Sequence, residues 1–143
     1  MTVVECLRNW FREYEGLSGR FSVDFLDEDA GTHSIDTIPC EEVLKEYLGG
    51  STRKQYQFAV SSRRFYEQNI AQNLENLQFF EDLTKWVEHK ANARELPVMD
   101  NGRTALKIVV TSNAYPFIIS EDGKARYQLQ MRLEYFQKRS NDK

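Results

Sequence analysis

The C-terminal quarter of the chain contains a run of alternating residues that constrains the fold more than any other feature. In residues 125–137, hydrophobic side chains occupy every second position and mostly polar ones lie between them. This period of two is typical of a β-strand with one buried face. The predicted buried face is Tyr127, Leu129, Met131, Leu133 and Tyr135, and the opposite face is Gln128, Gln130, Arg132, Glu134 and Phe136. With a turn at residues 121–124, the segment 115–137 is predicted to form a long β-hairpin.

Helical and strand-like patterns alternate along the rest of the chain. Apolar residues at helical spacing predict helices over residues 3–14, 41–48 and 73–91, the second closed by Gly49 and Gly50. Alternation predicts strands over residues 20–26, 32–38, 54–62 and 106–111, the first two joined as a hairpin by the acidic turn at residues 27–31. These elements predict an α+β fold whose sheet is mostly antiparallel, or mixed, with two main amphipathic helices packed on one face.

The long helix is expected to supply most of the apolar surface that covers the sheet. Its predicted stripe consists of Leu74, Leu77, Phe80, Leu83 and Val87, beside Phe79 and Trp86. The two strongest apolar faces of a chain must bury each other. We therefore expect Leu129, Met131 and Leu133 to pack against Leu77, Phe80 and Trp86.

Length and composition restrict the class of protein. The 143 residues suit one domain, predicted over residues 1–137, followed by a frayed polar tail over 138–143. Lysine and arginine number 19 against 22 aspartates and glutamates, mixed along the chain, which argues against a nucleic-acid-binding surface. Cys6 and Cys40 fit no zinc or redox spacing, and neither an export signal nor a membrane span is expected.

Residues able to perform acid-base chemistry form no catalytic pattern. His33 follows a predicted turn and His89 lies near the polar end of the long helix, so both are expected to be surface histidines. The pairs Glu28-Asp29 and Glu121-Asp122 invite a carboxylate or calcium interpretation, but both occupy predicted hairpin tips, where polar residues suit turn geometry. We therefore expect no enzyme activity, no metal and no cofactor.

Two further segments are similar to ligand-binding motifs. Residues 49–54 have the composition of a phosphate loop, but they lie between a predicted helix and a strand, the reverse of the Walker order. A helix C-cap followed by a turn explains them better. Arg63 and Arg64 end a predicted strand and suit phosphate or the carboxylates of a protein partner.

Three segments taken in order carry a family resemblance: GGSTRKQYQFAVSSRRFY at residues 49–66, NLENLQFFEDLTKWVE at 73–88 and ARYQLQMRLEYFQ at 125–137. The chain resembles, over nearly its whole length, siphophage and prophage proteins of Gram-positive bacteria known as minor capsid or tail terminator proteins. The resemblance implies a compact α+β fold and a ring, commonly of six copies, on the last ring of the tail tube. There the ring stops tube polymerisation and presents a surface to the head connector, and it has no active-site residues.

The expected function is therefore that of a virion structural protein at the head–tail junction, made in the cytoplasm of the bacterial host. Its implied partners are further copies of itself, the major tail tube protein and a head-connector or head-completion protein. DNA would pass through the ring lumen without specific recognition, and no membrane is involved. The alternatives are a neighbouring connector or tail-completion protein and a small intracellular adaptor domain, with an enzyme third.

The ring interface is expected to use polar loops and edge strands, because the apolar faces are needed for the core. The expected interface residues are Asp27, Glu28, Asp29, Gly49, Gly50, Ser51, Thr52, Arg53, Arg63 and Arg64. Exposed charges are screened within about 8 Å in physiological salt. We therefore expect the isolated protein to be monomeric or weakly associating at micromolar concentration, and its association to weaken as salt rises.

Overall fold

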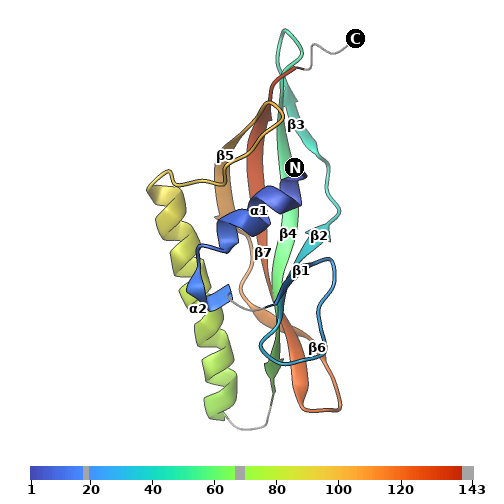
Figure 1. The fold of residues 1–143 in the computed structure, drawn as a ribbon, viewed down its shortest axis with the longest axis vertical. Helices are drawn as coiled ribbons and strands as arrows, with labels where there is room; N and C mark the ends of the chain where they lie inside the picture. The colour runs from blue at the N-terminus through green and yellow to red at the C-terminus, as the bar shows by residue number, and fades with distance from the viewer. Residues whose placement is uncertain (18–19, 67–69, 140–143) are drawn as a thin grey trace.

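The computed structural model describes residues 1–17, 20–66 and 70–139. In this part of the chain, one mixed sheet of seven strands runs along the long axis of the molecule, accompanied by two α-helices (Figure 1). The elements in order are α1 (Val3–Phe11), η1 (Glu15–Leu17), β1 (Phe21–Val23), β2 (His33–Ile38), β3 (Val43–Glu46), β4 (Thr52–Phe65), α2 (Ile70–Asn92), β5 (Arg103–Val110), β6 (Tyr115–Ile119) and β7 (Lys124–Gln137). All strand pairs except β1 with β2 are antiparallel, which confirms the predicted α+β class and mostly antiparallel sheet.

Strands β4 and β7 form the centre of the sheet. Each has 14 residues, and they pair along their whole length, from Thr52 opposite Gln137 to Phe65 opposite Lys124. At about 3.3 Å per residue, the pair spans roughly 45 Å. Strands β2 and β3 lie beside β4, whereas β5 and β6 lie beside β7. The pairing of β6 with β7 confirms the predicted hairpin at residues 115–137.

The alternation predicted for the last strand is confirmed. Its five expected inward residues, from Tyr127 to Tyr135, are all buried, and Phe58 and Val60 of β4 lie in the same hydrophobic cluster. The cluster also contains buried residues of both helices, namely Leu7, Trp10, Phe11, Phe80, Leu83 and Val87. We call the side of the sheet that carries these residues the core face, and the other side the polar face.

Helix α1 begins at a capping box. The Thr2 hydroxyl accepts a hydrogen bond from the Glu5 amide at 3.2 Å, and the Glu5 carboxylate accepts one from the Thr2 amide at 3.2 Å. The helix ends at Phe11, before the predicted residue 14, and a 3₁₀ turn follows. Gly16 lies in that turn. Burial of Trp10 and Phe11 fixes α1 against the core.

Helix α2 confirms the predicted long helix but buries a different stripe. Phe80, Leu83 and Val87 are buried as expected, whereas Leu74 and Leu77 are 60% and 39% exposed. The expectation for these two leucines is wrong because the first turns of α2 present Asn76 to the interior instead. The Asn76 amide donates to the Phe65 carbonyl at 2.7 Å and its oxygen accepts from Arg64 and Gln72, so this buried polar side chain is satisfied.

The predicted hairpin of residues 20–26 and 32–38 is wrong, because β1 and β2 pair in parallel. A parallel neighbour requires the chain to return to the start of the first strand. Strand β1 has three residues, about 10 Å, so the loop of residues 24–32 is long enough to make that return. The loop leaves β1 at Asp24, whose φ is 53°, and is held at its far end by the Gly31 amide donating to the Arg63 carbonyl at 2.7 Å. Of the alternating apolar residues in this segment, Phe21 is buried, whereas Val23 and Phe25 are exposed.

The predicted short helix over residues 41–48 is also wrong, because Val43–Glu46 form strand β3. β3 pairs with the beginning of β4, so its backbone groups are satisfied by a neighbouring strand rather than within a helix. Gly49 and Gly50 are therefore the turn of a hairpin and not a helix C-cap. Their φ angles of 97° and 96° lie in the region that only glycine adopts easily, which fits the tight reversal between Tyr47 and Ser51.

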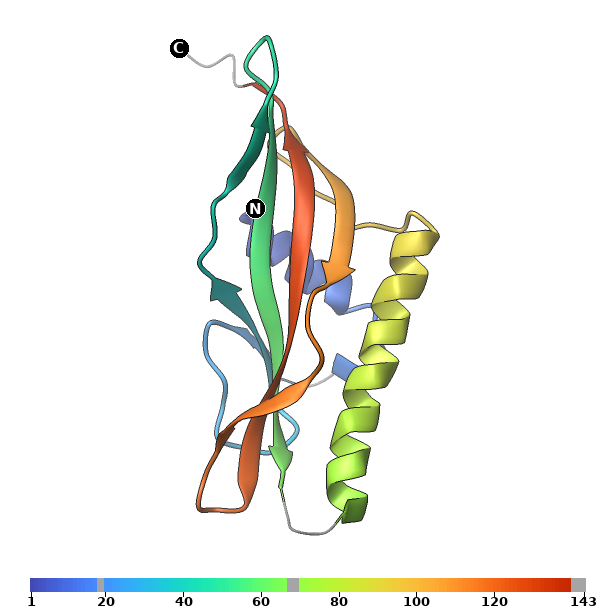
Figure 2. The same ribbon diagram turned by 180° about the vertical axis from the view of Figure 1, so that it is seen from behind.

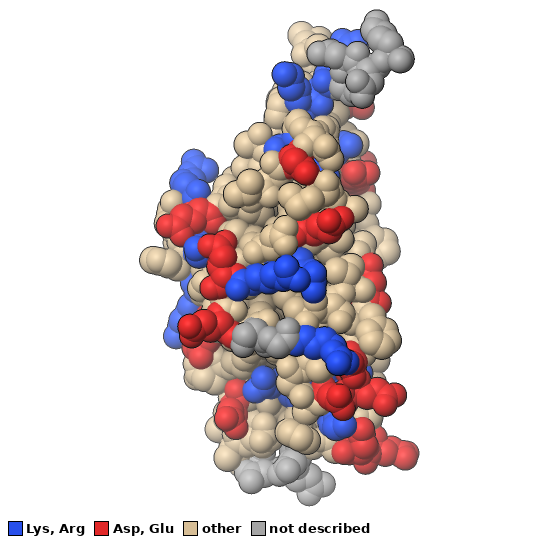
Figure 3. Space-filling model, viewed as in Figure 1, with Lys and Arg blue, Asp and Glu red and all other residues tan. Residues whose placement is uncertain are grey.

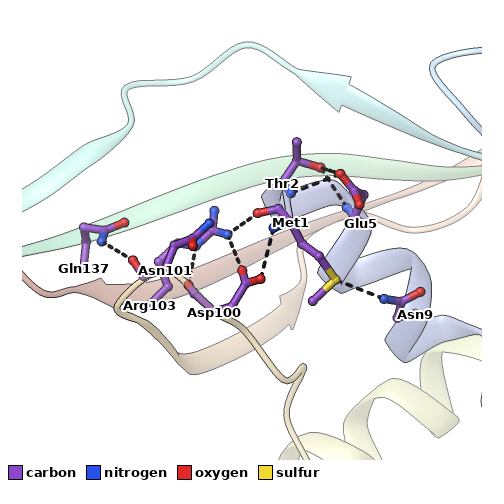
Figure 4. Close-up of polar contacts among 8 residues, drawn as sticks. All are labelled: Met1, Thr2, Glu5, Asn9, Asp100, Asn101, Arg103 and Gln137. Atoms are coloured by element: carbon purple, nitrogen blue, oxygen red, sulfur yellow. Dashed lines mark hydrogen bonds and ion pairs between the residues drawn. The ribbon is translucent and has the colours of Figure 1, made fainter.

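A polar cluster connects the start of the chain to the end of the sheet at which Thr52 pairs with Gln137 (Figure 4). The Met1 ammonium lies 3.0 Å from one Asp100 carboxylate oxygen, and the Arg103 guanidinium lies 2.9 Å from the other. Arg103 also donates to the Met1 carbonyl, and Gln137 donates to the Asn101 carbonyl at 2.9 Å. The cluster fixes the beginning of α1 to the turn that precedes β5 and to the end of β7.

The predicted polar tail is described only at Lys138 and Arg139, and residues 140–143 lie outside the described part of the chain. The Lys138 amide donates to the Gly102 carbonyl at 2.8 Å, and the Arg139 guanidinium donates to the Gly49 carbonyl at 3.2 Å. These two residues therefore lie beside the turn before β5 and the turn between β3 and β4.

Candidate interaction surfaces

The predicted interface residues fall into two groups at opposite ends of the β4–β7 pair. Asp27, Glu28 and Asp29 lie in the β1–β2 loop beside Arg63, near the end of β4. Residues 49–53 lie in the β3–β4 hairpin and at the start of β4. Because β4 has 14 residues, the two groups are roughly 40 Å apart. They therefore cannot form one continuous patch, and we call them the lower and upper ends, as they stand in Figure 1.

The lower end combines an acidic loop with basic strand ends. The Arg63 guanidinium donates to the Asp27 carbonyl at 3.2 Å, Arg20 forms an ion pair with the Asp27 carboxylate, and the Lys124 ammonium donates to the Glu28 carbonyl at 3.1 Å. Glu28 and Asp29 remain exposed. Figure 3 shows acidic side chains gathered at the lower right, where this loop and the β6–β7 hairpin lie. The lower end therefore presents carboxylates on a loop held in place by three cations.

Arg64 does not join Arg63 in this surface, because neighbouring strand residues point to opposite faces. The Arg64 Nε donates to Asn76 at 3.1 Å, and its guanidinium lies 4.6 Å from the centre of the Phe79 ring. Burial lowers the pKa of Arg64 from its ordinary value. Arg64 therefore serves the packing of α2 against the sheet.

His33 is buried, so its predicted surface position is wrong. It lies on the core face of β2 with 4% of its surface exposed and stacks on Phe79, with ring centroids 5.5 Å apart. Burial, together with the charge of Arg64, lowers the pKa of His33 to about 4. Its Nδ1 has no hydrogen-bond partner in the described part of the chain. His33 is therefore a neutral packing residue. It was expected at the surface because residues 27–31 were predicted to be a hairpin turn, and that hairpin is wrong.

The upper end is the β3–β4 hairpin and the start of β4. Gly49, Gly50 and Ser51 form its turn, and Leu48 beside them is fully exposed. The backbone amide of Arg139 donates to the Ser51 hydroxyl at 3.4 Å. This end therefore combines an exposed leucine with a nearby arginine, in contrast to the acidic lower end.

Arg53 belongs to the polar face rather than to the hairpin tip. Its guanidinium donates to Glu134 at 2.8 and 3.0 Å, and Arg132 donates to the other Glu134 oxygen at 3.0 Å. Burial alone would raise the pKa of Glu134, but the two guanidinium groups outweigh burial and hold the pKa below its ordinary value. A second network joins Asp36 to Arg126 and to the hydroxyls of Ser34 and Ser61.

The sheet has two open sides within the described residues. One side is formed by β1, β3 and the end of β2, and the other by β5 and β6. A groove of about 720 Å³ lies between β5 and the C-terminal half of α2, lined by Val87, Ala91, Leu96, Leu106, Ile108 and Val110 among others. All four residues of β3 are exposed, including Val43 at 37% and Leu44 at 45%. Sequence reasoning missed this edge because it assigned these apolar residues to a helix.

Among the described residues, no three histidine, cysteine or acidic side chains lie together as metal ligands would, and no helix is long and apolar enough to span a membrane. Cys6 is buried and Cys40 is exposed. Comparison with protein families found no family model that matches the chain, and no curated protein sequence matches it either.

Proposed function

We propose that this chain is a phage virion structural protein, a tail terminator that caps the tail tube as a ring and forms the surface to which the head is joined. The observation that carries the proposal is the elongated sheet, whose two ends differ chemically and whose two sides are open. A ring requires two different lateral surfaces on each copy, because a heterologous contact that closes joins one patch to another. The sequence resemblance supplies the biological setting.

The two ends suit the two faces of such a ring. With the ring axis parallel to the strands, the acidic lower end and the glycine hairpin of the upper end lie on opposite ring faces. One face would meet the last ring of the major tail tube protein and the other the head connector. Because the ends differ in charge and apolar exposure, each ring face can be specific for a different axial partner.

The arrangement of helices is part of the proposal. We infer that both helices cover the core face and leave the polar face of β4 and β7 open, as supported by the shared core cluster and by Figure 2, in which no helix crosses in front of the central strands. On that open face Asp36 pairs with Arg126, and Glu134 with two arginines. A wall whose charges are already paired suits a lumen through which DNA passes without specific binding.

Electron microscopy of the protein with tail tubes tests this function. Tubes polymerised from the major tail protein are mixed with the chain, and we expect a ring density at one end of each tube and an arrest of elongation. The β4–β7 pair would stand parallel to the tube axis. Binding to an isolated head connector without binding to tubes would instead support a neighbouring connector protein. Binding to neither would support the adaptor alternative.

Light scattering tests the strength of self-association. We expect a monomer or weak oligomer at micromolar concentration. Association should weaken as the salt concentration rises from roughly 50 to 500 mM, because added salt shortens the Debye length and screens charged contacts. A template at the tube end raises the effective concentration of neighbours and would complete the ring. A tight, salt-insensitive hexamer would show that apolar surface dominates the interface.

A further inference from the structure

The two open sides of the sheet carry strands at matching heights. Following the pairing across the upper half, Glu46 lies in one row with Thr52, Gln137 and Arg103. Two residues further along β4, Val43 lies in one row with Lys54, Tyr135 and Ala105. Strands β3 and β5 therefore occupy the same level on opposite edges of one sheet. A copy of the chain displaced sideways by one sheet width would bring its β3 next to β5.

The directions of the two edge strands are also compatible. β3 and β7 both run antiparallel to β4, and β5 runs antiparallel to β7, so β3 and β5 point in opposite directions. Rotation about an axis parallel to the strands preserves these directions. A β3 strand from a neighbouring copy would consequently meet β5 as an antiparallel partner, the pairing that edge strands adopt most readily.

In two rows, an acidic residue of one edge lies at the level of a basic residue of the other. Glu46 lies at the level of Arg103. The Glu42 carbonyl accepts a hydrogen bond from the Gln55 amide, so Glu42 lies beside Gln55. In the sheet, Gln55 is paired with Glu134 and Glu134 with Lys107. Glu42 therefore lies at the level of Lys107. Lys107 is exposed and forms no ion pair within the described residues. Glu46 and Glu42 thus stand at the heights of two basic residues of β5, which favours this register over a shifted one.

The apolar surfaces match as well. Val43 shares its row with Tyr135, so its side chain is on the core face. On the opposite edge, the groove between β5 and α2 has an apolar lining that includes Leu96, Ile108 and Val110. An added strand would therefore place Val43 toward this groove and remove an exposed valine from water. Each copy supplies both the strand and the groove.

The geometry points to a specific contact between copies, and we propose that β3 of one copy adds to the free edge of β5 of the next, extending the sheet from subunit to subunit. The contact is heterologous, so each copy offers β3 on one side and β5 on the other. It deepens the ring proposed above, and its closure into a ring rests on that function. The ends of the molecule, including Asp27 and Gly49, then remain free for the axial partners.

The edges of the lower half of the sheet are less suited to pairing with a second copy. There β1 has three residues, and β6 contains Pro116 followed by a register shift. Proline removes a backbone donor, and bulges twist an edge away from a partner, so both features discourage pairing. β5 has eight residues and no proline, although its register also shifts near Leu106. The upper half is therefore the part of the edge that a second copy would use.

Disulfide trapping tests the contact. In a Cys40→Ser background, Val43→Cys and Ala105→Cys are introduced together. Within one copy these positions are separated by three strand spacings, about 14 Å, which is beyond the reach of a disulfide. Oxidation of concentrated protein is expected to give a ladder of covalent oligomers that ends at a closed ring on a non-reducing gel. The same ladder should form more efficiently with tail tubes present.

Matched variants give the controls. Ser22→Cys with Ala105→Cys places one cysteine in the lower half of the same edge and should give no ladder. Lys107→Glu added to the trapping pair should reduce the ladder several-fold, and Glu42→Lys added to that variant should restore it. Covalent dimers from Val43→Cys alone, in place of the ladder, would show two-fold pairing of like edges and overturn the proposal.

Failure of this contact is distinguishable from failure of the proposed function. If rings cap the tubes in micrographs but no ladder forms, the terminator role stands and the edge pairing is wrong. If the ladder forms but tubes elongate without arrest, the edge pairing stands and the terminator role is wrong. Absence of the ladder at high protein concentration, with or without tubes, overturns the pairing.

Discussion

The two faces of the β4–β7 pair are made by the same strands but hold the molecule together in different ways. On the core face, Phe58, Leu129 and Leu133 are buried in an apolar cluster with both helices. On the polar face, Asp36 contacts Arg126 and two serine hydroxyls, and Glu134 contacts two arginines, and none of these partners comes from a helix. Apolar burial contributes roughly in proportion to area, whereas ion pairs near the surface contribute little net energy.

The difference teaches that stability and interaction are separated by face and by edge. The core face provides most of the apolar burial that stabilises the long sheet. The polar face and the edges contribute less, so changes there should have smaller effects on folding.

The largest test of this comparison is Leu129→Ala on the core face. Removing a buried leucine side chain costs about 2 to 5 kcal/mol of unfolding free energy, because transfer energy is lost and a cavity remains. The neighbouring variant Gln130→Ala on the polar face should cost about 1 kcal/mol or less, since it removes one hydrogen bond to the Tyr115 hydroxyl. Urea titration measures both. A Leu129→Ala loss below about 0.5 kcal/mol would show that the core face is wrongly assigned.

The next test concerns His33, a titratable group on the core face. Its native pKa of about 4 lies below the ordinary value of 6.5, so the unfolded chain takes up the proton first as pH falls. The stability held by the neutral imidazole is present above pH 6.5 and is lost as pH falls toward 4, by about 3 kcal/mol in total.

The variant His33→Phe is the matched control, because a phenyl ring can keep the stack on Phe79 but does not titrate. We expect its unfolding free energy to fall less between pH 6.5 and 5 than that of the unmodified chain. Chemical denaturation at a series of pH values measures the difference. Equal slopes for the two proteins would contradict the neutral, buried state of His33.

A smaller effect is expected from Asp36→Asn on the polar face. The change removes the charge that faces Arg126, whose side chain is 24% exposed, and a partly buried cation left without its partner should cost about 1 to 3 kcal/mol. Glu42→Gln is the surface control, since Glu42 is 62% exposed and lies 3.7 Å from Lys54. Its loss should stay below about 1 kcal/mol. Similar losses for both variants would mean that the Asp36 network is no stronger than a surface ion pair.

Sequence patterns identified the parts of the fold in which local burial decides the structure. β7 and β4 were predictable because their apolar periodicity matches the face that they bury. The long helix was predictable in position, although it buries Asn76 and leaves Leu74 and Leu77 exposed. β3 was not, since Val43, Leu44, Tyr47 and Leu48 also fit helical spacing, and pairing with β4 decides between the two. The parallel entry of β2 depends on contacts such as Gly31 with Arg63, which join residues distant in sequence.

The candidate surfaces were predictable in chemistry but not in position. The acidic tip and the glycine hairpin are exposed loops, as their composition predicted. These two loops lie at opposite ends of the molecule because β4 is long, and no local sequence pattern predicts their separation. Arg64 could not be separated from Arg63 by residue type, because it is the alternation of β4 that places Arg64 on the core face, beside Asn76 and Phe79.

The full-length pairing of β4 with β7 has a mechanical consequence. Its backbone hydrogen bonds run sideways between antiparallel strands, so a pull between the upper and lower ends of the molecule loads them in shear. In shear the whole row of bonds resists together, whereas peeling from one end would break them one after another. A molecule built around this pair would behave as a stiff strut along its long axis, able to transmit tension between its two ends with little extension.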